Sequence, residues 1–266
     1  MKSKFFLVPV ICSDLTSKVS SIECSKVHNI LTSLYAPDKK ELFVTYNNTM
    51  SSYIPFETNE QIIKDISRTF SNFQYFNKRS NSLGYDRLHR LLIALSTYRN
   101  IGYVQGINFI AASFLWHCDE EFAFFIINEL FKVLKVEENY TDNLIGVQTK
   151  SQIFFDEFLH KHEPEVHQNL AEKEILPIMI FAEWIVTLGF SIIPIEHHIS
   201  LINGLLENKW EFLYHTIANY LHAVFHVVKD LDFGETLTVI KGANEHNIQE
   251  KYGFALDWTK ILGQRR

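Results

Sequence analysis

The stretch that decides the fold is Tyr98–Asn108, which reads Tyr-Arg-Asn-Ile-Gly-Tyr-Val-Gln-Gly-Ile-Asn. It follows a segment with amphipathic helical spacing and precedes an apolar one, so it is predicted to form a bend between two helices. Gly102 and Gly106 lie on either side of Gln105, and glycine lets the backbone turn and be approached closely. A carboxamide held outward on such a bend donates and accepts hydrogen bonds in a fixed direction. Turn chemistry alone favours the simpler interpretation, an ordinary helix–helix turn that contains a glutamine.

A second informative stretch lies upstream, where a helical pattern begins near Glu60. Its apolar residues recur at helical spacing and predict one buried stripe: Ile62, Ile63, Ile66 and Phe70. Asp65 and Arg68 are i,i+3 neighbours on the adjoining face, close enough to form an ion pair. From spacing alone, the simpler interpretation is a surface ion pair that stabilises the helix by at most ~1 kcal/mol.

Together the two stretches resemble a known family. Ile-x-x-Asp-x-x-Arg at 62–68, followed by Tyr-x-Gln-Gly at 103–106, resembles the two signature motifs of the TBC domain, the Rab GTPase-activating fold. The resemblance continues through three further segments, Arg87–Ala94, Phe181–Thr187 and Lys209–His215. It covers about residues 60–240 in the family's order. It implies an all-α fold, a two-lobed helical domain of about a dozen or more helices.

The resemblance also implies a mechanism. In that family an arginine and a glutamine enter the active site of a partner GTPase, so Arg68 is expected to stabilise charge on the phosphates and Gln105 to orient the attacking water. The expected partner is a Rab-family small GTPase in its GTP form, which implies a role in vesicle trafficking. The sequence holds no Gly-x4-Gly-Lys-Ser/Thr loop, so no cofactor is expected on this chain, and GTP and Mg2+ would come bound to the partner. The domain would then activate an enzyme without being one itself.

Four further residues are expected to support Arg68 and Gln105, which we call the arginine finger and the glutamine finger. By the same resemblance, Asp65 orients the guanidinium or braces the loop, and Tyr103 shapes the finger loop. Gly102 and Gly106 permit its bend.

The chain is predicted to divide into three parts. Residues 1–59 lack the family's usual opening of an Arg, a Gly-x-Pro turn, another Arg and a Trp, so they are expected to be a divergent or truncated segment packed on the domain. Residues 60–164 form the N-terminal lobe, which carries both fingers. Residues 165–266 form a C-terminal helical lobe, with Pro164 marking the boundary.

Hydrophobic periodicity places the remaining elements. Beyond the finger helix, helices are expected at about 25–34, 87–95, 107–117, 121–135, 177–188, 195–206, 211–229, 234–242 and 245–262. Polar composition predicts solvated loops at 38–40, 47–49, 72–85 and 140–148.

Composition excludes several classes of function. The net charge is −6 with no basic block, which argues against a nucleic-acid partner. Three scattered cysteines fit a reducing compartment, so a cytoplasmic location is expected, with peripheral association with endomembranes through the partner. Ile175–Ile195 is long enough to span a bilayer, but Glu183 at its centre and two prolines favour a buried helix and no transmembrane segment.

Two other functions fit parts of the pattern. The missing N-terminal pattern and a turn before Gly102 that is one residue shorter than usual favour a GTPase-binding or scaffold module that keeps the fold without catalysing. A helical metal-dependent hydrolase would instead use His215, His222 and His226, of which the last two are an i,i+4 pair. The sequence shows no Glu after the first histidine of that pair and no evident third ligand such as cysteine, which weakens this alternative.

Overall fold

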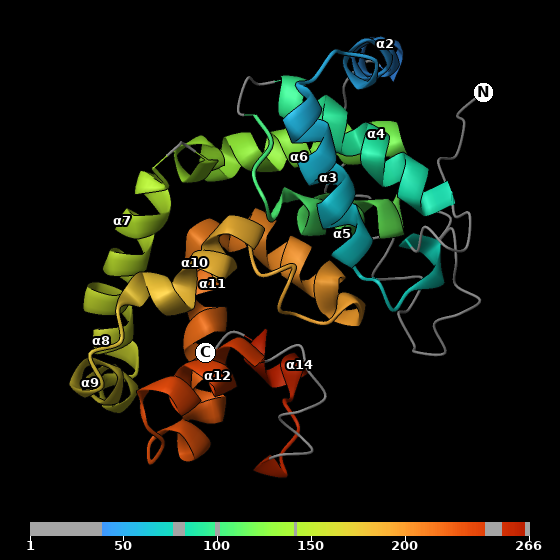
Figure 1. Ribbon diagram of the computed structural model, residues 1–266. Helices are drawn as coiled ribbons and strands as arrows, with labels where there is room; N and C mark the ends of the chain where they lie inside the picture. Colours follow the sequence, from blue (N-terminus) through green and yellow to red (C-terminus); the bar gives the residue numbers. More distant parts are fainter. Residues whose placement is uncertain (1–38, 77–82, 99–101, 141–142, 243–251, 264–266) are drawn as a thin grey trace. The chain divides into compact units, whose positions relative to one another are not determined.

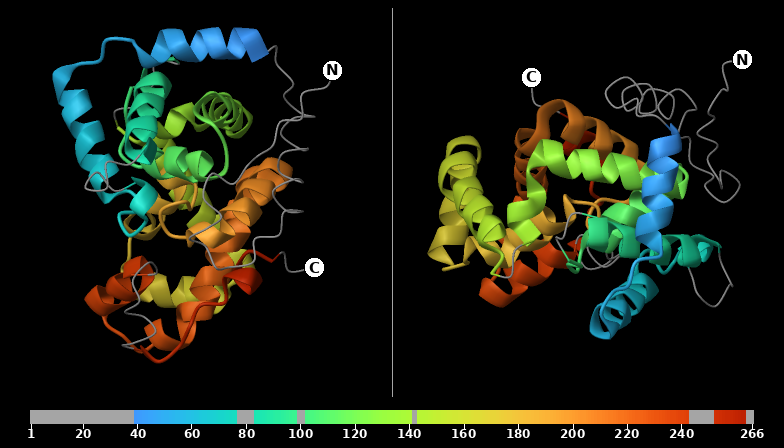
Figure 2. Two further views of the ribbon diagram at one scale, coloured as in Figure 1. Left: turned by 90° about the vertical axis from the view of Figure 1, so that its right-hand side faces the viewer. Right: turned by 90° about the horizontal axis from the view of Figure 1, so that it is seen from above.

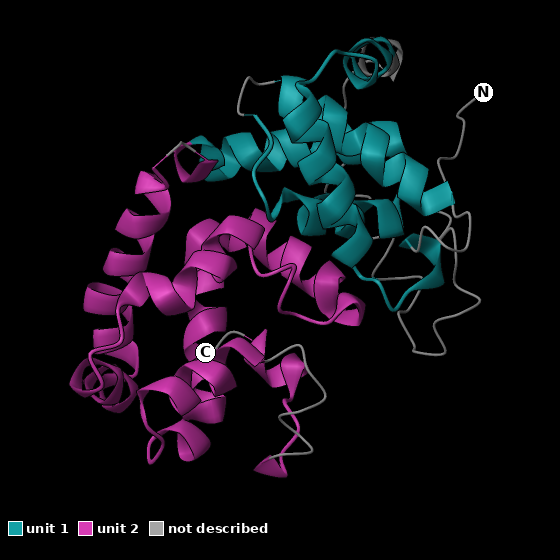
Figure 3. Ribbon diagram, in the orientation of Figure 1, with its two compact units in different colours: residues 1–137 teal, residues 138–266 magenta. Residues whose placement is uncertain are grey.

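The computed structural model of the chain describes residues 39–76, 83–98, 102–140, 143–242 and 252–263. Within these ranges the chain is predominantly helical and contains no β-strand, so the predicted all-α fold is confirmed. The chain divides into two compact units, residues 1–137 and 138–266 (Figure 3). The sequence placed a division at Pro164, but Pro164 begins a helix inside unit 2, at a position where its missing N–H group costs nothing.

Unit 1 is built around one central helix. In chain order its elements are α2 (Lys39–Met50), α3 (Phe56–Arg68), the 3₁₀ turn η1 (Gln74–Phe76), α4 (Leu83–Tyr98), α5 (Ile107–His117), α6 (Glu120–Leu134) and the start of the 3₁₀ helix η3 (Val136–Tyr140) (Figure 1). Helix α4 contacts α2, α3, η1, α5 and α6. It contains the helix expected at about 87–95, and four of its leucines are almost completely buried: Leu88, Leu91, Leu92 and Leu95.

Helix α2 occupies residues for which solvated loops were predicted, at 38–40 and 47–49, so both predictions are wrong for the described residues from Lys39 on. It packs against α4 and α6 at one edge of unit 1 (Figure 2). Tyr46 is buried, its hydroxyl donates to Glu120 Oε1 at 2.9 Å, and its ring lies 5.5 Å from that of Phe124. Arg90 binds the same Glu120 carboxylate through Nε at 2.9 Å and Nη2 at 2.8 Å. Tertiary contacts hold this helix, which explains why periodicity did not predict it.

The predicted polar loop at 72–85 is also partly wrong. Within it, η1 places Tyr75 and Phe76 in the core, each with its ring centroid 6.0 Å from that of Trp116. Helix α4 begins at Leu83, where Gly84 lies directly against the Tyr75 carbonyl oxygen and ring. A side chain at position 84 would occupy space that Tyr75 already fills.

We therefore expect Gly84→Ala to lower the free energy of unfolding by about 1–3 kcal/mol, because the added methyl group overpacks the η1–α4 contact. Urea denaturation followed by far-UV circular dichroism measures the effect. The control is Gly234→Ala, because a Cβ at Gly234 would meet only the Asp232 carboxylate at an ordinary 3.6 Å. Equal stability of the two variants would contradict the tight contact at position 84.

Unit 2 is organised around one long helix. Its elements are the end of η3, α7 (Ile145–Ile153), the π-helical turn η4 (Phe154–Leu159), α8 (His160–His162), α9 (Pro164–Glu172), α10 (Pro177–Thr187), η5 (Ile195–His197), α11 (His198–Val228), α12 (Phe233–Lys241) and α14 (Trp258–Ile261). Helix α11 contacts α9, η4, η5, α12 and α14. Large aromatic side chains fill this core, with Tyr220 of α11 packed between Trp184 at 5.4 Å and Trp258 at 5.9 Å.

Several predicted boundaries in unit 2 change. The two helices expected at 195–206 and 211–229 form α11, but Lys209 interrupts it with φ 53° and ψ −134°, so the predicted break is present. The solvated loop expected at 140–148 contains the start of α7, which begins at Ile145. Of the helix expected at 245–262, residues 245–251 lie outside the described ranges, and α14 begins only at Trp258. The helix expected at 25–34 also lies outside them.

The segment Ile175–Ile195 contains α10, which ends after Thr187 where Leu188 takes a left-handed conformation with φ 53°. Across the described ranges, no helix combines the length and apolar character needed to cross a membrane.

Candidate functional site

The site begins at the C-terminal end of α3. Of the apolar stripe predicted here, Ile62 and Ile66 are fully buried and anchor the helix, whereas Ile63 is only partly buried. Arg68 is the last residue of α3, and its side chain is 49% exposed. Phe70 does not extend the helical stripe as predicted. It takes a left-handed conformation with φ 44° and packs its ring 5.6 Å from Phe109 of α5, which turns the chain away from the helix end.

The predicted ion pair between Asp65 and Arg68 forms. Arg68 Nε donates to Asp65 Oδ1 at 3.0 Å, and Arg68 Nη2 lies 2.7 Å from the same oxygen. Gln61 Nε2 donates to Asp65 Oδ1 as well, at 3.0 Å. The Asp65 side chain is only 1% exposed, so this is not the ordinary surface pair that spacing alone suggested. A carboxylate buried this deeply needs such donors, because burial removes the water that would otherwise solvate its charge.

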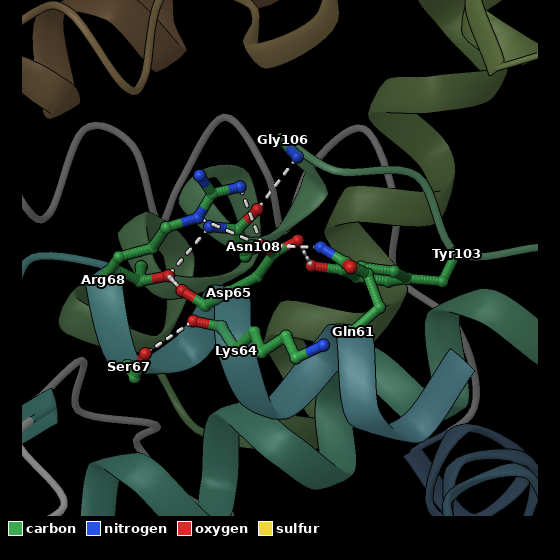
Figure 4. Close-up of polar contacts among 9 residues, drawn as sticks. Gln61, Lys64, Asp65, Ser67, Arg68, Tyr103, Gly106 and Asn108 are labelled. Atoms are coloured by element: carbon green, nitrogen blue, oxygen red, sulfur yellow. Dashed lines mark hydrogen bonds and ion pairs between the residues drawn. The ribbon is translucent and has the colours of Figure 1, made fainter. Parts of the chain in front are cut away.

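The same carboxylate reaches the finger loop. Tyr103 donates its hydroxyl to Asp65 Oδ2 at 2.7 Å, so Asp65 lies between Arg68 and Tyr103 (Figure 4). Burial, followed by the hydrogen bond to Asp65, raises the pKa of Tyr103 far above its usual value. The hydroxyl therefore stays protonated and remains a donor. One buried carboxylate thus connects the end of α3 to the loop that precedes α5.

The loop presents Gln105 to solvent. Gly102 has φ 70° and Gly106 has φ 118°, both in the region that glycine adopts without strain, so the two glycines occupy the bend as expected. Gln105 is exposed, and the next residue, Gly106, is buried at the start of α5. Tyr103 and Gln105 are two residues apart, so Asp65 fixes the loop immediately before the exposed carboxamide. Residues 99–101, which include the shortened turn, lie outside the described ranges.

A second connection between α3 and the loop was not predicted from the sequence. Asn108 Oδ1 accepts a hydrogen bond from the Gly106 backbone N–H at 2.9 Å (Figure 4). Asn108 Nδ2 donates to Thr69 Oγ1 at 2.8 Å. Thr69 in turn donates to the Asp65 carbonyl oxygen at 2.6 Å. Asn108 and Thr69 are both fully buried. The available signal was an asparagine inside the otherwise apolar start of α5, because a buried amide requires partners.

The histidines proposed for a metal site have separate surroundings. His222 Nδ1 lies 2.8 Å from Glu163 Oε2, and His226 Nδ1 lies 2.9 Å from the Ala223 carbonyl oxygen of its own helix. His215 packs its ring 4.8 Å from Phe158. In the part of the chain that the structure describes, no three His, Cys, Asp or Glu side chains gather as metal ligands.

We expect Tyr103→Phe to destabilise the domain by about 1–3 kcal/mol, because a buried carboxylate oxygen loses its donor. Equilibrium urea denaturation measures this loss. Tyr53→Phe is the matched control, since Tyr53 is 90% exposed, and this variant should unfold like the wild type. If both variants unfold at the same urea concentration, the Tyr103–Asp65 contact contributes nothing to stability.

The sequence matches known proteins over most of its length. Residues 23–226 match the family described as the Rab-GTPase-TBC domain. Mouse TBC1 domain family member 4 is 33% identical over 50% of this chain, and human TBC1 domain family member 14 is 28% identical over 66%. TBC1 domain family member 12 of Xenopus tropicalis is 27% identical over 82%. This chain spans 10%, 25% and 34% of the lengths of these three relatives, respectively.

Solved structures show the same fold. The Ypt/Rab-GAP domain of Gyp1p superposes with a TM-score of 0.66 at 18% identity, covering 84% of this chain and 77% of that one. The Chlamydomonas flagellar RabGAP TBC domain also gives 0.66, at 17% identity, covering 92% of this chain and 77% of that one. The helical fold and the matched sequence define a domain of the TBC type. The chain belongs to the Rab-GTPase-TBC domain family.

Proposed function

We propose that this domain activates GTP hydrolysis by a Rab-type small GTPase in its GTP form, with Arg68 and Gln105 inserted in trans. The observation that carries the proposal is that one buried carboxylate, that of Asp65, binds Arg68 directly and also holds Tyr103, two residues before the exposed Gln105. The Arg68 guanidinium and the loop that carries the Gln105 carboxamide are thereby both bound to the Asp65 side chain.

These two groups match what GTP hydrolysis needs. Charge spreads over the phosphate oxygens in the transition state, and the attacking water must be held in line. A guanidinium carries a permanent charge and five N–H donors, so Arg68 can keep its contact with Asp65 and still donate to phosphate oxygens. Gln105 both donates and accepts, as the positioning of a water requires, and it would take the place of the GTPase's own glutamine.

The nucleotide and Mg2+ are proposed to arrive with the GTPase. Association with endomembranes in vesicle trafficking is likewise proposed to come through the partner.

Single-turnover GTP hydrolysis across a panel of Rab-type GTPases tests the proposal, with phosphate release measured at increasing concentrations of the domain. We expect strong acceleration for one or a few members of the panel. Binding to a GTP-loaded Rab without acceleration would instead identify a scaffold module that keeps the fold without catalysing. If the domain neither binds nor accelerates any member, the proposed function is wrong.

A further inference from the structure

Asn108 uses both ends of its carboxamide to join parts of the chain that are far apart in sequence. On one side it accepts from the Gly106 backbone N–H, and on the other it donates to Thr69, which is 39 residues away in sequence. Both Asn108 and Thr69 are fully buried, so neither hydrogen bond competes with water. The oxygen and nitrogen assignments agree with the partners, because a backbone N–H needs an acceptor and Thr69 Oγ1 already donates to the Asp65 carbonyl.

The bond to Gly106 fixes the peptide unit that Gln105 shares with its neighbour. Gly106 precedes the first turn of α5, where a backbone N–H has no partner within the helix. Asn108 Oδ1 supplies that partner and thereby sets the plane of the Gln105–Gly106 peptide. Since this peptide begins at the Gln105 backbone, its orientation sets the direction in which the exposed Gln105 side chain leaves the loop.

The hydrogen bond from Asn108 to Thr69 connects the Gln105–Gly106 peptide to the end of α3, the helix that carries Arg68. Thr69 immediately follows Arg68 and is bonded to the carbonyl of Asp65, one turn earlier. Gln105 is therefore held from both sides. Tyr103, two residues before it, binds the Asp65 side chain, and Asn108, three residues after it, binds the Asp65 backbone through Thr69.

We propose that Asn108 and Thr69 are positioning residues that set the direction of Gln105 relative to Arg68, and that they affect catalysis only through Gln105. This inference rests on the proposed function. In reactions that depend on positioned groups, a displacement of about 1 Å can cost about 100-fold in rate. Loss of the hydrogen bonds of Asn108 would allow such a displacement without changing Arg68 or Gln105 themselves.

The test uses Thr69→Val, which keeps the shape of the side chain and removes its hydroxyl, with Thr69→Ser as the matched control that retains it. The probe is the GTP-loaded Rab that the wild-type domain activates. At saturating domain we expect Thr69→Val to slow single-turnover hydrolysis by roughly 10- to 100-fold, with the half-saturating concentration nearly unchanged. Thr69→Ser should hydrolyse at close to the wild-type rate.

The same substitutions in a Gln105→Ala background separate positioning from general destabilisation. If Thr69 acts through Gln105, Thr69→Val causes no further loss in that background. Equal losses in both backgrounds, a slow Thr69→Ser, or a Thr69→Val variant as fast as wild type would each overturn the inference and leave the proposed function intact.

A structural measurement checks the Gly106 contact without any GTPase. Amide hydrogen exchange at Gly106 should accelerate in Asn108→Ala and stay slow in the wild type, because Asn108 Oδ1 is its acceptor. An unchanged rate in Asn108→Ala would overturn the inference. A wild-type domain that shows this protected amide but activates no Rab would place the failure in the proposed function, and the catalytic role of Asn108 would fall with it.

Discussion

Arg68→Ala is expected to slow single-turnover GTP hydrolysis on the activated Rab by ~10^3 to 10^5-fold, the range that an arginine supplied in trans contributes. The loss is expected because alanine lacks the guanidinium that is proposed to stabilise charge on the phosphate oxygens. Arg68→Lys should remain strongly impaired, since an ammonium lacks the planar fork that binds Asp65 and phosphate together. Stopped-flow measurement of phosphate release at saturating domain gives both rates.

The control for Arg68 is Lys64→Ala. Lys64 is an exposed cation one turn earlier on the same helix, so the two substitutions remove the same charge from α3. Lys64→Ala should retain the wild-type rate at saturation. If it is as slow as Arg68→Ala, the effect is one of overall charge and not of a positioned guanidinium. A wild-type rate for Arg68→Ala would remove the arginine from the mechanism.

Gln105→Ala is expected to reduce the same rate by about 10^2 to 10^3-fold, the range for removing one positioned polar group from a transition state. Folding should be unaffected, because the side chain is exposed. Gln74→Ala is the matched control, since Gln74 is another exposed glutamine in unit 1, and it should hydrolyse like the wild type.

The partner provides a second test of the glutamine's role. If Gln105 positions the water in place of the GTPase's own glutamine, a Rab variant that lacks its own catalytic glutamine should still be activated by the wild-type domain. Gln105→Ala should then show no activity on that Rab variant. If the wild-type domain cannot activate this Rab variant, the GTPase's own glutamine positions the attacking water. Gln105 would then contribute to binding and not to positioning the water.

The sequence predicted the parts of the site that local spacing controls. The spacing of Ile62 and Ile66 predicted that they share a buried face of α3, and both are buried. The i,i+3 spacing of Asp65 and Arg68 predicted their ion pair, which forms. The two glycines around Gln105 predicted a bend, and both have positive φ. Each of these features depends on neighbours within about two helical turns, where periodicity and backbone conformation decide the geometry.

Features that depend on distant partners were not predictable in this way. The hydrogen bond from Asn108 to Thr69 joins residues 39 apart, and Tyr46 of α2 is held by Glu120, 74 residues later. The spacing of residues within one helix does not predict pairs that lie so far apart in sequence. The burial of Asp65 belongs to the same class, because spacing shows that a carboxylate can meet an arginine but not that this carboxylate is buried against a loop that arrives from elsewhere.

The burial of Asp65 also decides how an inert form of this domain should be made for capturing its partner. Replacing Arg68 removes the counter-ion of the buried Asp65 carboxylate. The hydrogen-bond donors that remain, from Gln61 and Tyr103, are neutral. Such a variant loses stability together with activity. Gln105 is exposed, and no hydrogen bond among the described residues involves its side chain. A bait protein that must hold a GTP-loaded partner in a living cell is therefore better made by changing Gln105, which leaves the charge balance of the interior intact.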